Sequence, residues 1–409
     1  MAMKLSLNSI SPSVLEMREN SGDRAEIVME GRILAYEHAR RGKTAMNAAL
    51  GLSAAELGTE KLSEREYKKL NETFQREHLL YAAKKACETD DTTAPESFDE
   101  FKKMGQKFYA NSAFLKVLQG IYQEIVKPIL PAVYSEAVSR FADVVEVGFA
   151  ETYAISVGSN DIPIFQDSAW GASRSVPANR FYAKDFVLNP QPKTAEIRWK
   201  WHQLVGNGMD FGAFFANLAA GMYAKTMGMW HEMMAAAASN TALIPTGLIY
   251  NFSSVNWVTL ANKLAAVNNT DIGNILAYGN AVALSKVLPN QATGSSNVNM
   301  DAALATLLGA DYIRDAQLGE YMRVRLMALR DAVIPGTQNT GVTTVLDSSK
   351  IWLMAGNGRK PMTIAYNAYT PISIEIRPEE TASFEYILNL TTALDAVSVF
   401  ASHVGLINI

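Results

Sequence analysis

Hydrophobic positions in the first third of the chain recur at helical spacing. From residue 14 to about 130, charged side chains mix with apolar ones three or four positions apart, as in Tyr67, Leu70, Phe74, His78 and Tyr81. The acidic stretch CETDDTTAPESFDEF at 87–101 interrupts this pattern with a proline and helix-capping residues. We therefore expect a loop there between helices. The segment SEAVSRFADVV, after Pro128 and Pro131, predicts one more helix.

From Thr152 the hydrophobic period changes to two. The runs TYAISV, IPIF, RFYAKDFVLN and TAEIRWKWHQLV are separated by Gly, Ser, Asn and Pro, which is typical of strands joined by turns. The turn at 189–192 divides the last two runs and predicts a hairpin with arms of about ten residues, roughly 30 Å long. Because a two-stranded ribbon is marginal in water, this hairpin needs a surface to lie on.

The second arm of this hairpin alternates strictly. Two sets of side chains interleave along it: Ile197, Trp199 and Trp201 in one, and Glu196, Arg198, Lys200 and His202 in the other. Tryptophans beside cations suggest base stacking and phosphate contacts. Strand alternation explains every residue without a nucleic acid, so we favour a strand with one apolar and one charged face.

A long helix follows the hairpin. Asp210 can cap a helix over 211–239, about 40 Å long, whose apolar stripe comprises Phe211, Phe215, Leu218, Met222, Met229 and Met233. From 241 onward short strands alternate with helices. The tail from 373 returns to strand period.

Composition places the chain among folded globular proteins. Of its 409 residues 48% are hydrophobic and 19% are charged. A net charge of −4 argues against holding nucleic acid by overall positive charge, although a local basic patch stays open. Cys87 is the only cysteine, which excludes an intrachain disulfide and a thiolate metal cluster. Neither a secretory signal nor a membrane span is recognisable, so we expect a cytoplasmic protein without membrane contact.

Catalytic and cofactor motifs are incomplete. The sequence Gly42-Lys43-Thr44 ends like a phosphate-binding loop, but the glycine required five positions before Gly42 is Glu37. His231-Glu232 begins a zinc-protease pattern whose second histidine is replaced by Ala235. Gly206 and Gly208 precede a helix, but the third glycine of a dinucleotide-binding motif is missing. We expect no metal, no cofactor and no enzymatic activity.

The order of these elements resembles a known family. The residues that carry the resemblance are RFYAKDFVLNPQPKTAEIRWKWHQLVGNGMDFGAFFANLAAGM, in which a hairpin, a short elbow and a long helix follow one another. They resemble the major capsid protein of tailed bacteriophages, with the Hong Kong 97 shell fold. The similarity extends over about residues 130–409 and implies an α+β fold.

The resemblance implies a division of the chain into six segments. These are a helical N-terminal extension (1–110), a helix and strands of the peripheral domain (111–177), the extended loop or E-loop hairpin (178–206), the spine helix (207–240), the axial domain (241–372) and a closing strand of the peripheral domain (373–409). The expected contacts between subunits lie in the hairpin: Tyr182, Phe186, Ile197, Arg198, Trp199, Lys200 and Trp201.

The resemblance also implies the function and the partners. Copies of the chain would assemble as pentamers and hexamers into an icosahedral shell in the host bacterial cytoplasm, and end in the virion. The shell would enclose double-stranded DNA without sequence specificity. Portal, scaffolding and decoration proteins are further candidate partners. Two alternatives stay open: an encapsulin-like nanocompartment with the same fold, and a cytosolic enzyme whose site escapes sequence reading.

Overall fold

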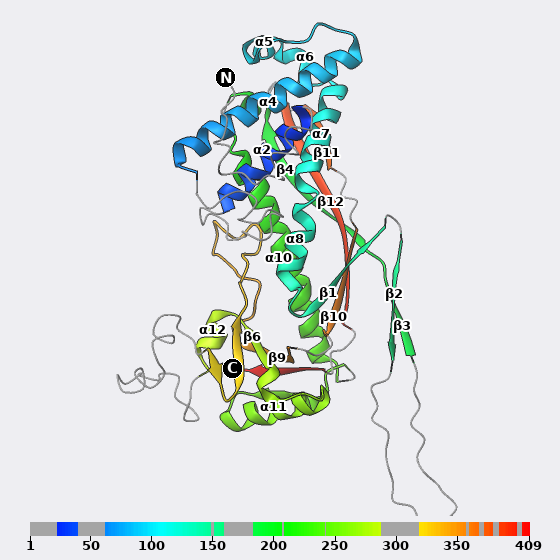
Figure 1. Cartoon of the computed structure of the whole chain (residues 1–409), viewed down its shortest axis with the longest axis vertical. Helices are drawn as coiled ribbons and strands as arrows, with labels where there is room; N and C mark the ends of the chain where they lie inside the picture. The colour runs from blue at the N-terminus through cyan, green and yellow to red at the C-terminus, as the bar shows by residue number, and fades with distance from the viewer. Residues whose placement is uncertain are drawn as a thin grey trace, which may run out of the picture.

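The computed structural model is an elongated α+β molecule (Figure 1). It describes residues 23–39, 62–148, 151–158, 183–206, 208–241, 243–287, 319–356, 360–367, 372–378, 384–398 and 403–409. Helices gather at one end, a second sheet with its helices lies at the other, and helix α10 with strand β12 connects the two ends. The α+β class agrees with the expectation from the sequence.

The N-terminal part is helical, as its spacing predicts. Its helices are α2 (Asp23–His38), α4 (Glu64–Asp90), α5 (Phe98–Lys103), α6 (Gly105–Phe108), α7 (Ser112–Val126) and α8 (Ile129–Val138). Helix α4 begins with a capping box, in which the Ser63 hydroxyl accepts from the Glu66 N–H and the Glu66 carboxylate accepts from the Ser63 N–H. It ends at Asp90 inside the acidic stretch. The loop predicted for 87–101 is confirmed for 91–97, whereas 87–90 end α4 and 98–101 begin α5.

The helix predicted for SEAVSRFADVV is only partly correct. Helix α8 ends at Val138, and strand β1 (Ala142–Val147) begins four residues later. Residues 142–147 pair in parallel with β10 (Met362–Asn367), whose six residues are all buried. The partner strand lies more than 200 positions away, so helical spacing in a short window does not reveal it.

The first sheet has five strands. Their order is β1-β10-β12-β11, and β4 (Gln191–Lys200) pairs with the edge of β12 (Phe384–Ser398) opposite to the edge that pairs with β11 (Ile372–Pro378). A single strand, β12, thus pairs with β11 and β4 along its first part and with β10 along its last part. This long strand carries the sheet along the molecule (Figure 1).

The predicted hairpin between 178–188 and 194–205 is wrong in its pairing. Strand β3 (Ala183–Leu188) pairs antiparallel with β2 (Tyr153–Gly158), whereas β4 pairs antiparallel with β12 over ten residues. The apolar face of β4 is only partly covered: Trp199 is buried against Phe214, whereas Ala195 and Ile197 are half-buried. The strand ends at Lys200, and Trp201–Val205 form the short helix α9 instead of continuing it.

The second sheet occupies the other end of the molecule. Its order is β5 (Ile249–Asn251), β13 (Val404–Asn408), β9 (Lys350–Ala355), β6 (Ile275–Gly279), β8 (Val324–Ala328) and β7 (Glu320–Tyr321). Helices α11 (Ser254–Val267) and α12 (Ala281–Ser285) accompany it, with short 3₁₀ turns at Thr246–Leu248 and Ile272–Asn274.

This arrangement corrects the expected boundary at 372. Strand β10 (Met362–Asn367) already belongs to the first sheet, and β13 (Val404–Asn408) returns to the second. The cause is hydrogen bonding between strands distant in sequence: β13 pairs with both β5 and β9, while β10 pairs with β1 and β12. The chain therefore crosses between the two sheets more often than its linear pattern suggests.

Helix α10 (Phe211–Ser239) has the bounds that the sequence predicts, with Asp210 as its cap. The predicted stripe is buried only in its first half, since Met229 and Met233 stay partly exposed. In the second half Trp230 takes the core position, with its ring centroid 4.3 Å from that of Phe141. The helix changes its buried side because it passes from the N-terminal helices to the second sheet.

Candidate assembly site

Trp199 packs within its own chain. Its side chain is 6% exposed, its ring stacks on Tyr386 with 6.4 Å between centroids, and it meets Phe214 of α10 edge-on at 5.8 Å. The expectation that Trp199 anchors a neighbouring subunit is therefore corrected: its hydrophobic surface is already covered by β12 and α10. Alternation in the sequence correctly identified the apolar face but not what covers it.

Trp201 lies at the start of α9 and is partly buried. Its ring centroid lies 6.1 Å from Phe101, 6.2 Å from Phe114 and 5.7 Å from Tyr386, so it joins α9 to the N-terminal helices. Most of its contact surface is also used inside the chain. Ile197 is half-buried beside the same core.

The charged face of β4 is exposed at Glu196 and Arg198 and half-buried at Lys200. Arg198 is exposed and its Nε donates to Glu196 Oε1 at 2.6 Å. The Lys200 N–H donates to Gln203 Oε1 at 3.0 Å and so marks the transition from strand to helix. An exposed ion pair of this kind adds little stability, which leaves Arg198 and Lys200 as surface residues that a neighbour can contact.

The β2–β3 ribbon is the element that stands off the body (Figure 1). Its base packs where Leu188, Val147 and Ala365 form a small cluster with the half-buried Ile155. Farther out, Val187 is 63% exposed and lies beside Asp185 on the strand, while Phe186 is half-buried opposite Ile155. Tyr182 lies outside the described residues. The ribbon thus presents uncovered apolar surface, although the sequence assigned it to a different pair of strands.

Each strand of the ribbon has a free edge. Among the described strands, β2 and β3 pair only with each other. A strand pair with free edges and an uncovered face can bind another protein surface, either by strand pairing or by packing of that face.

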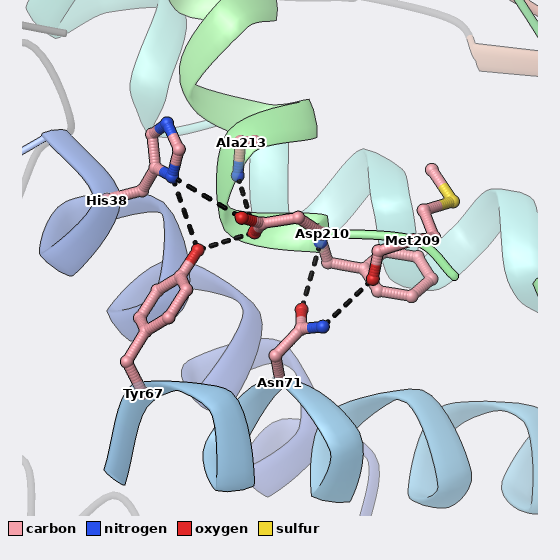
Figure 2. Close-up of polar contacts among 7 residues, drawn as sticks. His38, Tyr67, Asn71, Met209, Asp210 and Ala213 are labelled. Atoms are coloured by element: carbon pink, nitrogen blue, oxygen red, sulfur yellow. Dashed lines mark hydrogen bonds and ion pairs between the residues drawn. The ribbon is translucent and has the colours of Figure 1, made fainter. Parts of the chain in front are cut away.

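The elbow before α10 is held by side chains of the N-terminal helices (Figure 2). Asn71 donates to Met209 O at 2.8 Å and accepts from the Phe211 N–H at 2.9 Å. Tyr67 donates to Asp210 Oδ1 at 2.5 Å, and the same oxygen accepts from the Ala213 N–H at 3.0 Å. His38 Nδ1 lies 3.3 Å from the Tyr67 hydroxyl and 3.7 Å from Asp210 Oδ2. We refer to Tyr67, Asn71 and Asp210 as the elbow clamp.

Sequence reasoning found only part of this clamp. Asp210 was recognisable as a helix cap, whereas Tyr67 and Asn71 are distant in sequence and carry no local signal. Together Asn71 and Asp210 satisfy two N–H groups in the first turn of α10, which would otherwise have no partner within the helix. Helices α2 and α4 therefore fix the direction in which the spine helix leaves β4.

Side chains that could ligate a metal ion are dispersed in the described part of the chain. No three His, Cys, Asp or Glu side chains there lie close enough to hold a metal ion. His231 is half-buried on α10, where burial lowers its pKa; nearby Lys350 lowers it further, and Asp347, Asp331 and Glu232 oppose the shift. The Gly42-Lys43-Thr44 motif lies outside the described residues.

No helix in the described part of the chain is both long and apolar enough to cross a membrane.

Comparison with known proteins gives matches among solved structures alone. No family model and no curated protein matches the chain. A structure from Mycobacterium phage Adephagia shares 9% identity and a TM-score of 0.39, covering 66% of this chain and 89% of its own. The mature capsid of bacteriophage PhiM1 shares 13% and 0.37, covering 66% and 85%. The virus-like particle from Pyrococcus furiosus shares 10% and 0.36, covering 68% and 96%.

Because the TM-scores lie below 0.5, we infer the function of the chain from its own geometry.

Proposed function

We propose that this chain is the major capsid protein of a tailed bacteriophage, a structural subunit that assembles with copies of itself. The carrying observation is the β2–β3 ribbon, which projects from the body with two free edges and an exposed Val187. A two-stranded ribbon gains stability when it lies on another surface. In a protein that associates with itself, that surface belongs to a neighbouring copy.

The geometry favours closed rings over symmetric pairs. The ribbon and the broad body of the subunit are different parts of the chain, so a ribbon-to-body contact is heterologous. Heterologous contacts close into rings when their rotation allows it. We infer that the rings are pentamers and hexamers of an icosahedral shell, and that Phe186, Arg198 and Lys200 contribute to their contacts together with Tyr182.

Double-stranded DNA is the proposed content of this shell. A net charge of −4 supports confinement of DNA rather than tight binding, because non-specific affinity for DNA depends on neutralising its phosphates with cations. Assembly would take place in the cytoplasm of a host bacterium and yield the virion capsid. Portal, scaffolding and decoration proteins would bind the assembled shell, and no catalytic role is proposed for the subunit.

Electron microscopy of the purified full-length chain tests this function. Uniform hollow particles, with DNA in those recovered from infected cells, are the expected result. Small oligomers under all assembly conditions would contradict it. Particles filled with protein cargo would indicate a nanocompartment instead.

A ribbon variant links the particles to the proposed contact. Val187→Asp places a charge on the exposed face of β3, whereas Val187→Thr keeps the shape and the strand preference of the residue. We expect the Asp variant to unfold at the same temperature as the parent while forming few particles, and the Thr variant to form normal ones. Equal particle yields for both variants would exclude this face of the ribbon from the contact.

A further inference from the structure

A second recognition surface lies away from the ribbon, between β4 and α10. The two elements enclose an open groove of about 670 Å³. Its lining includes Ala195 and Ile197 of β4, which we call the wall, Leu218, Gly221 and Met222 of α10, which we call the floor, and Pro335. This volume falls within the usual range for ligand sites. Its lining is mainly apolar.

The wall of this groove is an unpaired strand edge. Among the described strands, β4 pairs only with β12, so its other edge has no partner strand. In an antiparallel strand, alternate residues direct their N–H and C=O groups toward opposite edges. About half of the β4 backbone groups are therefore available to a further strand, apart from the N–H that Pro192 lacks.

Two cations flank the apolar floor. Lys193 of β4 and Lys225 of α10 both line the groove. Neither forms an ion pair with another described residue, in contrast to Arg198 on the opposite face of β4. An uncompensated pair of lysines favours a partner that carries a carboxylate. Lys193 and Pro192 also discourage pairing by arbitrary neutral strands, because lysine and proline are common protectors of free edges.

We propose that this groove binds an extended segment of a second protein by strand addition to β4. The segment directs alternate apolar side chains onto Leu218, Gly221 and Met222, and a carboxylate side chain toward Lys193 and Lys225. Main-chain hydrogen bonds supply affinity, while the floor and the two lysines select an apolar and acidic sequence. This site stands independently of the proposed shell function.

The unpaired edge of β4 offers one strand position beside the groove. Pro335 also lines the groove, and the segment before it is tied to α10, where the Tyr223 hydroxyl donates to Arg330 O at 3.2 Å. Neighbouring strands in a sheet lie about 4.8 Å apart, so a two-stranded ribbon would need a second strand position beyond the first. A chain end or a linker of a partner protein needs only this one position, whereas the β2–β3 ribbon of another copy would need two.

Gly221 leaves space in the floor of the groove because it has no side chain. A Cβ atom built at this position meets nothing within 4 Å. A large side chain there fills the groove without displacing the chain itself, and it removes a glycine from a helix interior, which favours the helix. Gly221→Leu is therefore a variant that closes the groove while preserving the fold.

Peptide binding to the full-length protein tests the proposal. The probe is a fluorescein-labelled heptapeptide, TVTLTDT, blocked at both ends, with the matched control TVTLTKT. We expect saturable binding of the acidic peptide, roughly tenfold weaker binding of the lysine peptide, and loss of binding to Gly221→Leu. In the double variant Lys193→Glu, Lys225→Glu the preference should reverse toward the lysine peptide.

Backbone methylation distinguishes strand addition from simple filling of an apolar pocket. N-methylation of one alternate set of amides in TVTLTDT should abolish binding, and methylation of the other set should leave it largely intact, because only one set faces β4. Equal effects of both sets would overturn strand addition. No binding at millimolar peptide would overturn the site.

The identity of the occupant is tested by the same variant. If Gly221→Leu prevents association of the protein with itself and TVTLTDT does not bind, the groove receives another copy of this chain and the proposal is wrong. If particle formation is unchanged and peptide binding is lost, a separate partner is supported. A failure of the shell function alone would leave the peptide results unaffected, so the two proposals can be distinguished.

Discussion

His78 shows how burial fixes the protonation of a single side chain. It is fully buried on α4, stacked on Phe74 with 4.6 Å between centroids. Its Nδ1 lies 2.6 Å from Phe74 O and its Nε2 lies 3.3 Å from the Tyr122 hydroxyl. A carbonyl only accepts, so Nδ1 carries the proton and Nε2 accepts from Tyr122. The neutral ring is thus satisfied at both nitrogens, and burial lowers its pKa to about 4.

This shift makes stability depend on pH. Between pH 6.5 and about 4 the unfolded chain binds a proton at His78 that the folded chain does not, so stability decreases as the pH is lowered through this window. The difference of about 2.5 pKa units corresponds to roughly 3 kcal/mol at its lower end. Urea unfolding at pH 7 and at pH 5 measures how far the free energy of unfolding falls as the pH is lowered.

The control is the double substitution His78→Phe, Tyr122→Phe, which removes the titrating ring and the hydroxyl paired with it. The loss of stability from pH 7 to pH 5 should be smaller in this variant than in the parent protein. An identical loss would mean that other groups, such as carboxylates, account for the whole dependence.

Trp199 gives a second prediction at this scale. Trp199→Ala should destabilise the fold by about 3–5 kcal/mol, because a large buried side chain is removed. Its indole N–H has no hydrogen-bond partner among the described residues, so Trp199→Phe should cost far less. Chemical denaturation of both variants checks the order. Comparable stability of the Ala variant and the parent would place the ring outside the core.

At the scale of elements, local sequence patterns predict whether a segment is a helix or a strand better than they predict which strands pair. The α10 bounds, its Asp210 cap and the loop after Asp90 follow from spacing and capping chemistry, which act over a few residues. The pairing of β4 with β12 joins positions almost 200 residues apart, and alternation is equally compatible with any partner strand. The elbow clamp could not be predicted from the sequence for the same reason. The role of Asn71 depends on its hydrogen bonds with Met209 and Phe211, which are about 140 positions away in the sequence.

Two glycines of α10 make a matched prediction. Gly221 faces open space, so Gly221→Ala should raise the free energy of unfolding by about 0.5–1 kcal/mol. At Gly212 a Cβ atom would lie 2.6 Å from Leu34 O in α2, which is backbone and cannot rotate away. Gly212→Ala should therefore destabilise the chain. Thermal unfolding of the two variants compares them directly, and equal shifts would contradict the close approach of α10 to α2.

At the scale of the whole molecule, both sheets share one hydrophobic core. A continuous cluster of buried residues extends from the N-terminal helices through α10 to the second sheet, as in the contact of Trp230 with Phe141 and Trp352. The chain also crosses between the sheets through β10 and β13. These connections favour unfolding as one unit.

Calorimetry tests this cooperativity. We expect one transition for the unassembled subunit, with fluorescence and circular dichroism midpoints that coincide. Trp230→Ala should lower that single midpoint because it removes the side chain that joins the two halves of the core. Two separated transitions in the parent protein would show that the sheets unfold independently.

The position of β13 has a consequence for synthesis on the ribosome. This strand is the last of the described elements to be made, yet it lies between β5 and β9 inside the second sheet. Strands β5 and β9 therefore wait for their shared neighbour while the rest of the polypeptide emerges. A nascent chain interrupted before Val404 cannot complete this sheet, so only molecules whose translation has passed this point acquire the finished shape.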